Sequence, residues 1–244
     1  MDLGIAIRQF YKKEGNYSTF VLYDEGLTPI HVAAGSGHLK LLQTLWEKTE
    51  ERHPIDSTGK TPLLYASQNG HFEVCVYLMK KLKNKNQGDN NGWTPLHTAA
   101  YTGHFDICEL IMNNLENKNP GDNDGWTPLH YAASKNHFDV CELIMKNIEN
   151  KNPRDNRGKT PLHCAASNNC LKICKLIMKN LENKNPGSND GWTPLHWAAS
   201  EGHFAICKLF LENVQEKMPK TSLGATPASF AMVRGHHEVA SLFK

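Results

Sequence analysis

The sequence has no long run of apolar residues. None of its windows approaches the roughly 18 consecutive apolar residues by which a membrane-spanning helix is recognised. The N-terminal residues Met1–Arg8 contain neither a long apolar stretch nor the small-residue cleavage site of a secretory leader. We therefore expect no direct membrane insertion and an intracellular, cytoplasmic location, with the nucleus left open.

An excess of charge of one sign is also lacking. The 244 residues include 27 Lys and Arg against 25 Asp and Glu, which leaves a formal net charge of +2. A surface that binds nucleic acid needs a basic patch or stripe, so this balance argues against a nucleic-acid partner. No glycine-rich phosphate loop occurs, because the glycines of the turns stand singly. The hydrophobic share of 39% is low for a globular domain and favours a long, thin core.

The feature that the sequence does have is a repeat. The dipeptide Thr-Pro recurs at intervals of 33 residues, at Thr28, Thr61, Thr94, Thr127, Thr160, Thr193 and Thr226. Four copies extend the match to Thr-Pro-Leu-His-x-Ala, and these begin at Thr94, Thr127, Thr160 and Thr193. A unit of this length cannot bury its own hydrophobic face, so neighbouring copies must stack. The chain is therefore predicted to consist of one structural unit copied seven times.

This period and this motif relate the chain to a known family. Over residues 23–244 the sequence resembles the ankyrin-repeat family, in which a 33-residue period accompanies Thr-Pro-Leu-His-x-Ala. The resemblance implies an all-α fold, a solenoid of stacked helix-turn-helix units with β-turn fingers. It divides the chain into an N-terminal partial repeat or cap, residues 1–22, and seven repeats in one array: 23–55, 56–88, 89–121, 122–154, 155–187, 188–220 and 221–244.

The copy Asp122–Arg154 illustrates the local prediction. Its opening Asp-Asn-Asp-Gly is typical of a turn and predicts the finger. Thr127 then caps a first helix, and the proline after it fits the first turn, where no backbone donor is needed. A polar break at Lys135-Asn136 ends this helix, and His137 opens a second helix with apolar residues at helical spacing. We expect Asn147 to close the second helix in the left-handed conformation.

Seven cysteines suggest a metal site or a reactive thiol, but the spacing of five of them argues against a shared metal ion. Five of them stand 33 residues apart, so each fills the same core slot of its own second helix: Cys75, Cys108, Cys141, Cys174 and Cys207. Packed helix axes lie about 8–10 Å apart whereas zinc needs sulfur at about 2.3 Å, so these thiols cannot share an ion. His-Cys pairs such as His71 and Cys75 offer too few ligands. Cys164, Cys170 and Cys174 remain a candidate cluster of reactive thiols.

The histidines of the repeated motif are candidates for catalysis only when each is taken alone. No Ser or Cys recurs beside them together with a third, orienting group; they are His97, His130, His163 and His196. In the ankyrin-repeat family this histidine bonds locally and to the neighbouring repeat, so the resemblance implies a structural role for all four. We therefore expect a protein that is not an enzyme, with no catalytic residues, no cofactor and no metal.

The resemblance instead implies a binding surface on the fingers and on the exposed side of the first helices. The residue before Thr-Pro varies between copies and is tryptophan at positions 93, 126 and 192. Tryptophan anchors many protein interfaces. Each ring could equally cover the neighbouring finger and Pro120, Pro153 or Pro186, and both interpretations stay open. The candidate partner-binding residues are Trp93, Trp126, Trp192, Lys60, Lys159, Asn91, Asp124, Arg157, Asp190, Tyr101, Lys135 and Glu201.

A second variable slot lies within the first helices. In four copies it is aromatic, and we assign its members mainly to packing between repeats: Tyr65, Tyr131, Trp197 and Phe230. The exposed residues at the ends of the first helices also change from copy to copy, and so do the charges of the finger tips. Such a mixed surface suits a protein or peptide partner better than nucleic acid.

Three functions remain open. The first, which we favour, is a non-catalytic protein-interaction module, an adaptor or scaffold that is a monomer and binds a protein or peptide. The second is a mechanical spacer, or the cytoplasmic ankyrin domain of a larger protein such as a channel. In the third, the chain is a substrate: Asn119, Asn152 and Asn185 match the position that an asparaginyl hydroxylase modifies in ankyrin-family proteins, although the prolines that follow them depart from the usual small residue.

Overall fold

The computed structural model describes residues 26–49 and 52–244, so the prediction for residues 1–22 lies outside the described residues. The described residues form 14 helices and no β-strand, and the fold is all-α. The chain divides into two compact units, Met1–Asn117 and Lys118–Lys244. The boundary falls in the loop that ends the third copy.

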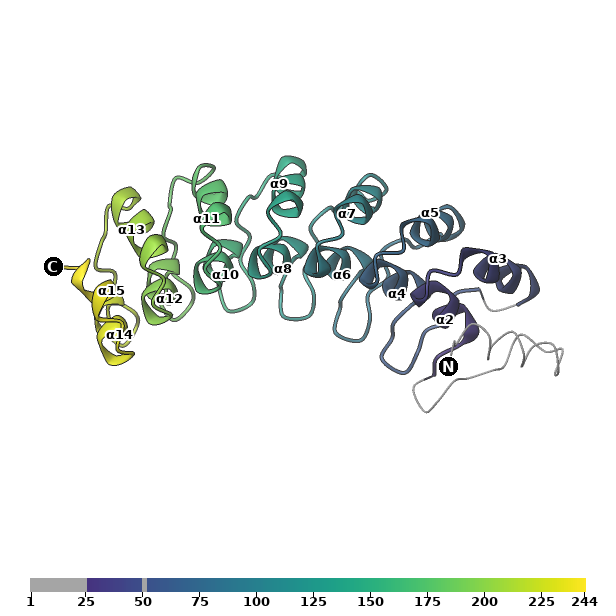
Figure 1. Cartoon of the computed structure of the whole chain (residues 1–244), viewed down its shortest axis with the longest axis horizontal. Helices are drawn as coiled ribbons and strands as arrows, with labels where there is room; N and C mark the ends of the chain where they lie inside the picture. Colours follow the sequence, from purple (N-terminus) through teal and green to yellow (C-terminus); the bar gives the residue numbers. More distant parts are fainter. Residues whose placement is uncertain (1–25, 50–51) are drawn as a thin grey trace. The chain divides into compact units, whose positions relative to one another are not determined.

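The described part of the first unit contains three helix pairs, one for each predicted copy. They are α2 (Pro29–Gly35) with α3 (Leu39–Lys48), α4 (Pro62–Gln68) with α5 (Phe72–Lys81), and α6 (Pro95–Thr102) with α7 (Phe105–Met112). In Figure 1 the first helices α2, α4 and α6 follow one another in one row, and α3, α5 and α7 form a second row beside it. The turn inside each pair carries a left-handed glycine, at Gly37, Gly70 and Gly103.

The second unit contains four helix pairs. They are α8 (Pro128–Ser134) with α9 (Phe138–Asn147), α10 (Pro161–Ser167) with α11 (Leu171–Met178), α12 (Pro194–Ser200) with α13 (Phe204–Asn213), and α14 (Pro227–Val233) with α15 (His237–Ser241). The predicted break at Asn136 is confirmed, because this residue lies between α8 and α9 with a φ of 62°. Asn169, with a φ of 58°, occupies the same position between α10 and α11. Asparagine tolerates this left-handed conformation better than most residues do.

Five of the first helices, α2, α6, α8, α10 and α12, begin with the same threonine–histidine cap, whereas Leu64 and Ser229 take the place of the histidine in α4 and α14. Thr127 is the N-cap of α8, and Nδ1 of His130 accepts a hydrogen bond of 3.1 Å from the backbone N–H of Thr127. The other ring nitrogen of His130, Nε2, donates to the carbonyl of Lys159 in the next copy at 3.3 Å. Together these bonds require a neutral ring with its proton on Nε2. The same bridge to the next copy is made by His31, His163 and His196.

Burial disfavours the charged form of two of these imidazoles. It lowers the pKa of the His163 ring to about 3 and also lowers the pKa of His196. A protonated ring would have no acceptor left for the backbone N–H of the capping threonine. The local bonding that the resemblance implies is present at all four predicted histidines, and the inter-repeat bond is present at His130, His163 and His196.

The core lies where the helices of a pair meet each other and the next pair. One face of α5 buries Val74, Cys75, Leu78 and Met79, which stand at the spacing of a single helical stripe. The five cysteines of the predicted core slot are all fully buried. The first helices bury small residues such as Ala132 and Ala133. Small side chains let neighbouring first helices approach closely, and in both units these helices contact one another more extensively than the second helices do.

The fingers are tight turns that are bonded to one another. In the fourth copy, Oδ1 of Asp122 accepts hydrogen bonds from two backbone N–H groups of its own turn. Asn156 in the next finger donates its backbone N–H to the carbonyl of Asp124 and its side-chain Nδ2 to the carbonyl of Asn123, both at 3.0 Å. Asn189 repeats both bonds one finger further along. The finger tips are therefore held at a fixed spacing within the second unit.

A third set of bonds connects the second helices to the preceding copy. The histidine before the second helix donates from Nε2 to a carbonyl near the end of the preceding first helix, 36 residues earlier. These bonds are His71 to Gly35 at 2.9 Å, His104 to Gln68 at 3.2 Å, and His203 to Ser167 at 3.0 Å. Within each unit, bonds between neighbouring copies thus occur at the finger, at the first helix and at the start of the second helix.

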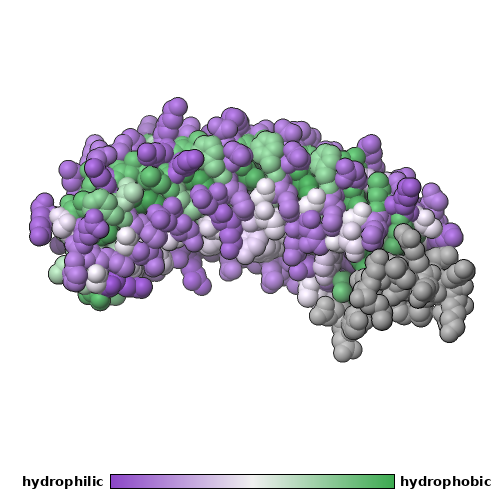
Figure 2. Space-filling view, viewed as in Figure 1, coloured by the Kyte–Doolittle hydropathy of each residue, from purple (hydrophilic) through white to green (hydrophobic). Residues whose placement is uncertain are grey.

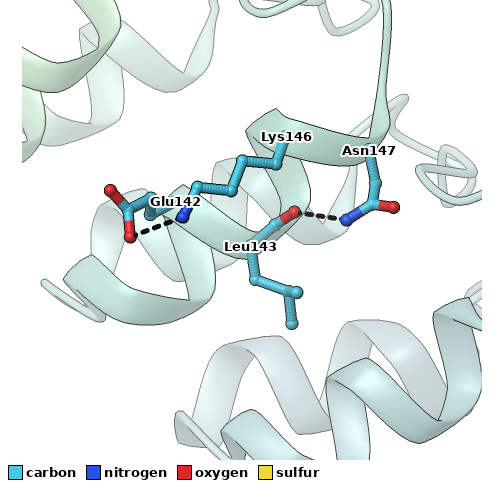
Figure 3. Close-up of polar contacts among 4 residues, drawn as sticks. All are labelled: Glu142, Leu143, Lys146 and Asn147. Carbon is cyan, nitrogen blue, oxygen red and sulfur yellow. Dashed lines mark hydrogen bonds and ion pairs between the residues drawn. The ribbon is translucent and has the colours of Figure 1, made fainter.

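The prediction for Asn147 is wrong. This residue is the last of α9, and the chain leaves the helix through Ile148 in an extended conformation. The side chain of Asn147 instead donates from Nδ2 to the carbonyl of Leu143 at 2.9 Å, beside the Glu142–Lys146 ion pair (Figure 3). The reason lies in the following loop, where Nζ of Lys151 donates to the carbonyls of Met145 and Ile148. Because the lysine satisfies these terminal carbonyls, no left-handed residue is needed.

The surface is mostly hydrophilic, with hydrophobic patches along the second helices and over α14 (Figure 2). Met232 and Val233 of α14 are exposed, although the same slots are buried or polar in the other copies of the second unit. Phe72 and Phe105, at the starts of α5 and α7, are partly exposed. Within the described residues, no helix has the length and apolar character that a membrane crossing requires.

Candidate functional site

The structure places the twelve candidate residues on the finger tips and on the first helices. We call this set the finger face. The first unit carries Lys60, Asn91, Trp93 and Tyr101. The second unit carries Asp124, Trp126, Lys135, Arg157, Lys159, Asp190, Trp192 and Glu201. The residues that stand before Thr-Pro are half-buried, and the others are exposed.

Each tryptophan of the finger face packs against an aromatic residue of the first helix that follows it. The ring centroids of Trp93 and Tyr101 are 5.5 Å apart. The corresponding distance is 5.1 Å for Trp126 and Tyr131. The tryptophans therefore have a packing role, and because each is only half-buried, part of its surface also faces solvent.

In the sixth and seventh copies this packing extends into an aromatic cluster. The ring of Trp192 lies 4.7 Å from that of Trp197 and 4.3 Å from that of Phe230. It also approaches His196, with centroids 5.9 Å apart. Phe230 belongs to the next copy, so the packing between repeats that we predicted for its slot is confirmed there.

Where the helix slot holds tyrosine, its hydroxyl is bonded to the finger. Tyr131 donates from its hydroxyl to Oδ2 of Asp122 at 2.6 Å, and Tyr65 donates to Oδ2 of Asp56 at 2.7 Å. Burial raises the pKa of Asp56, but hydrogen bonds from the Tyr65 and Thr58 side chains and from nearby backbone outweigh it, so the net pKa is lowered. In these copies the aromatic slot thus fixes the finger to its helix.

The fifth copy departs from this pattern at two slots. Lys159 stands where Trp126 and Trp192 stand in the neighbouring copies, and Cys164 stands in the aromatic slot. The smaller side chain leaves a cavity of about 60 Å³ in the finger face. We call this cavity the notch, and its walls include Trp126, Lys159, Cys164, Ser167, Asn168 and Trp197.

The notch combines aromatic walls with one positive charge. Nζ of Lys159 lies 4.2 Å from the ring centroid of Trp197, within cation–π distance. Lys159 is the one charged side chain among the lining residues. Asn168 donates from Nδ2 to the carbonyl of Cys164 at 2.9 Å, which holds that amide in place. Burial raises the pKa of the Cys164 thiol to about 12, so the sulfur is a neutral wall rather than a nucleophile.

Comparison with known families supports the geometry. A model of ankyrin repeats, three copies long, matches residues 6–89, 78–155, 115–186, 140–222 and 179–244. The chain belongs to the ankyrin-repeat family. No curated protein matches it. Ankyrin repeats are generally modules of protein–protein interaction, and recognition in such modules depends on the residues carried by the shared fold.

Some residues of this ankyrin array were missed or only partly understood from the sequence. Trp197 and Cys164 line the notch, although the sequence assigned the first to packing and the second to a group of thiols. The indole Nε1 of Trp197 is buried and finds no hydrogen-bond partner among the described residues. The equivalent tyrosine, Tyr131, bonds to Asp122, but Ser188 replaces this aspartate in the sixth copy. A comparison between copies of the aromatic helix slot and of the first finger residue would have indicated both the notch and the indole without a partner.

The thiol cluster gains no chemical activation from its surroundings. Burial raises the pKa of Cys170 and that of Cys174. No cluster of three or more His, Cys, Asp or Glu side chains suited to a metal ion occurs in the part of the chain that the structure describes. The five core-slot cysteines lie in five different second helices, one in each of α5, α7, α9, α11 and α13.

The three loop asparagines of the ankyrin array have a structural role. Oδ1 of Asn119 accepts a hydrogen bond of 3.2 Å from the backbone N–H of Leu129, at the start of α8. The equivalent bonds, from Leu162 to Asn152 and from Leu195 to Asn185, are both 3.1 Å long. Each asparagine thereby satisfies a backbone donor of the next first helix, which would otherwise have no partner within that helix.

Proposed function

We propose that this ankyrin array is a non-catalytic adaptor or scaffold that binds a protein or peptide partner on its finger face. One observation supports this most directly: copies with the same buried framework differ on this face. Trp126 packs on Tyr131 in the fourth copy, whereas Lys159 and Cys164 open the notch in the fifth. A surface that varies in shape and charge over a constant framework is suited to selecting one partner.

The tryptophans add binding potential to this face. Each ring is pre-positioned by an aromatic neighbour, so little side-chain freedom is lost when a partner covers its open part. Exposed charges of both signs surround the rings, including Asp124, Arg157 and Asp190. A protein or peptide with complementary charges would use both features.

The notch specifies one element of the partner. Lys159 and the adjacent indole of Trp197 form a small pocket with positive charge and aromatic walls. A short acidic side chain satisfies the ammonium group and fits the volume. The partner of this proposal therefore presents an aspartate or glutamate to the fifth copy.

Site-directed photo-crosslinking tests the choice of face. A photoreactive phenylalanine analogue is placed at Arg157 on a finger tip, or at the equally exposed Lys175 on α11 as a control, in cells that produce the protein. The proposal predicts that a discrete partner is crosslinked from position 157 and not from position 175. Crosslinks from position 175 alone would move the site to the outer helices. Crosslinks from neither would favour the mechanical spacer.

Selection of peptides from a random library tests the notch. Peptides that bind the immobilised wild-type chain should carry a recurrent acidic residue. They should lose affinity for Lys159→Ala and for Cys164→Tyr, which fills the pocket. Lys175→Ala provides the matched control, because it removes a lysine from the outer helix of the same copy. Enrichment of peptides that bind all three variants equally would contradict the assignment of the notch.

A further inference from the structure

The first unit contains a second and larger recess, which is separate from the finger face. Its volume is about 440 Å³, compared with about 60 Å³ for the notch. It lies between the C-terminal ends of α3 and α5 and the N-terminal ends of α4 and α6. Pockets that bind small molecules commonly have volumes of about 300–1,000 Å³. The recess is therefore large enough for such a ligand.

The lining of the recess is largely apolar. It includes Trp46, Leu63 and Leu78, which are buried, together with Pro62, Leu82 and Pro95. The indole of Trp46 is oriented by an edge contact with His53, whose ring centroid lies 5.3 Å away. Such a surface favours an apolar ligand body, because covering it removes hydrocarbon from water.

The polar part of the lining is cationic. Arg52, Lys81 and Lys83 contribute positive charge, and no aspartate or glutamate is among the described residues that line the recess. Lys81 also lies over the ring of Tyr77, with Nζ 5.7 Å from the centroid. A ligand that combines an apolar body with a negative group would match both parts of the lining.

The loop beside the recess differs from its counterparts in the second unit. In the second unit, Asn119 and its equivalents accept a backbone hydrogen bond from the next first helix, and a proline follows each of them. The equivalent residue in the first unit is Asn86, whose Oδ1 atom is buried and has no partner among the described residues. Gln87, which lines the recess, replaces the proline. The bond that attaches this loop to the next helix in the second unit is therefore missing here.

The charge at the recess is also specific to this place. Lys83 occupies the slot that is glutamate in the following three copies, at Glu116, Glu149 and Glu182. In the preceding loop, Arg52 and His53 replace the Lys-Asn pair of those copies. Departures in two successive loops thus meet at one cavity, where Lys83 adds a positive charge and Arg52 keeps the charge of the lysine that it replaces.

We propose that the recess binds a small amphipathic anion, an organic acid whose hydrocarbon body lies on Trp46, Leu63 and Leu78. Its carboxylate is held by Arg52 and Lys83. This ligand is a free small molecule, and its site is independent of the finger face on which the partner is proposed to bind.

Fluorescence titration with the dye anilinonaphthalene sulfonate tests the proposal, because the dye combines an aromatic body with a negative group. We expect saturable binding of about one dye per chain. Decanoate should displace the dye, whereas decylamine, which has the same chain length and the opposite charge, should not. Displacement by decylamine as effectively as by decanoate would overturn the proposal.

Matched variants locate the site. Lys83→Glu introduces the residue that the following copies already carry, at an exposed position, so the fold should be retained, as circular dichroism can verify. It should weaken dye binding by at least about tenfold. Leu82→Asp should act in the same direction, whereas Leu181→Asp, in the same slot of the fifth copy, should leave binding unchanged. Binding that survives Lys83→Glu and is lost in Val233→Ser would instead assign the dye to the exposed end of α14.

Discussion

The fourth and fifth copies, Asp122–Arg154 and Asp155–Gly187, share a framework and differ on their faces. Each begins with an aspartate that accepts two backbone hydrogen bonds of its own turn, and each starts its first helix with the same cap. The fourth copy joins Trp126 to an aromatic helix slot, whereas the fifth combines Lys159 with Cys164 and leaves the notch.

This difference separates two classes of position. Buried slots and capping residues determine how a copy folds and how it bonds to its neighbours. Finger-face slots alter shape and charge without changing that framework. Substitutions in the framework should therefore have equal effects in both copies, and exchanges between the faces should have opposite effects.

The largest effect is expected in the core. Leu129 and Leu162 occupy the same slot and are fully buried. Replacing either by alanine leaves a cavity, so we expect the free energy of unfolding to fall by about 3 kcal/mol in each variant. Urea unfolding followed by circular dichroism measures both losses. A difference between them of more than about 1 kcal/mol would show that the notch loosens the core of the fifth copy.

Acid is expected to have the next largest effect, through His163. Burial lowers the pKa of this ring to about 3 in the folded chain, below its ordinary value of 6.5. Between these values the unfolded chain binds a proton that the folded chain excludes. The free energy of unfolding should therefore decrease as the pH falls through this window, by up to about 2 kcal/mol near pH 4.5.

Urea unfolding at a series of pH values measures this dependence. His163→Gln retains a side chain that can accept the capping hydrogen bond and should show a shallower decrease. Asp56 contributes only at the acid end of this window, because its pKa is lowered from 3.8 and its stabilisation is lost as the pH falls through that value. An identical pH dependence in the His163→Gln variant would contradict the role of this ring.

Exchange of the helix slots should change stability in opposite directions. Tyr131→Cys removes the hydrogen bond to Asp122 and the contact with Trp126, so we expect a loss of about 2 kcal/mol. Cys164→Tyr fills the notch and places a hydroxyl where it can donate to Asp155, so we expect a gain of up to about 1 kcal/mol. Thermal unfolding compares the two variants with the wild type. Destabilisation by Cys164→Tyr would mean that the fifth copy does not accommodate the ring.

The smallest effect is expected at Lys159. Lys159→Met keeps the apolar stem and removes the charge over Trp197, which should lower the free energy of unfolding by less than about 1 kcal/mol. Lys60→Met is the control, because Nζ of Lys60 lies farther from its aromatic neighbour, at 5.7 Å from the ring of Tyr65. Urea unfolding at low and high salt measures both variants. A larger loss in the control would contradict the importance of the closer contact.

The helices could be predicted from the sequence because their ends depend on residues within one copy. Thr127 caps α8 and Asn136 ends the turn that follows it, as their side-chain chemistry indicates. The closure of α9 was predicted wrongly because it depends on Lys151, which reaches back from the loop to the helix carbonyls. The sequence does not show how far a flexible side chain reaches.

The finger face was predictable in position and less so in detail. The variation before Thr-Pro identified its residues, but the packing of Trp126 on Tyr131 depends on the distance between two slots in the fold. The notch depends on the volume that Cys164 leaves empty beside its neighbours. The recess in the first unit adjoins a loop in which Oδ1 of Asn86 has no partner among the described residues. These are properties of space between side chains, which a repeat pattern does not describe.

The bonds between copies restrict how the length of this protein can change during evolution. They connect residues 29, 33 and 36 positions apart, at the first helix, the finger and the start of the second helix. Losing a single residue from a copy would move donors away from their carbonyls at all three places. Removing 33 consecutive residues would supply every donor with an equivalent acceptor, because neighbouring copies are interchangeable in this respect. Insertions and deletions of complete repeats should therefore be tolerated far better than indels of one or two residues.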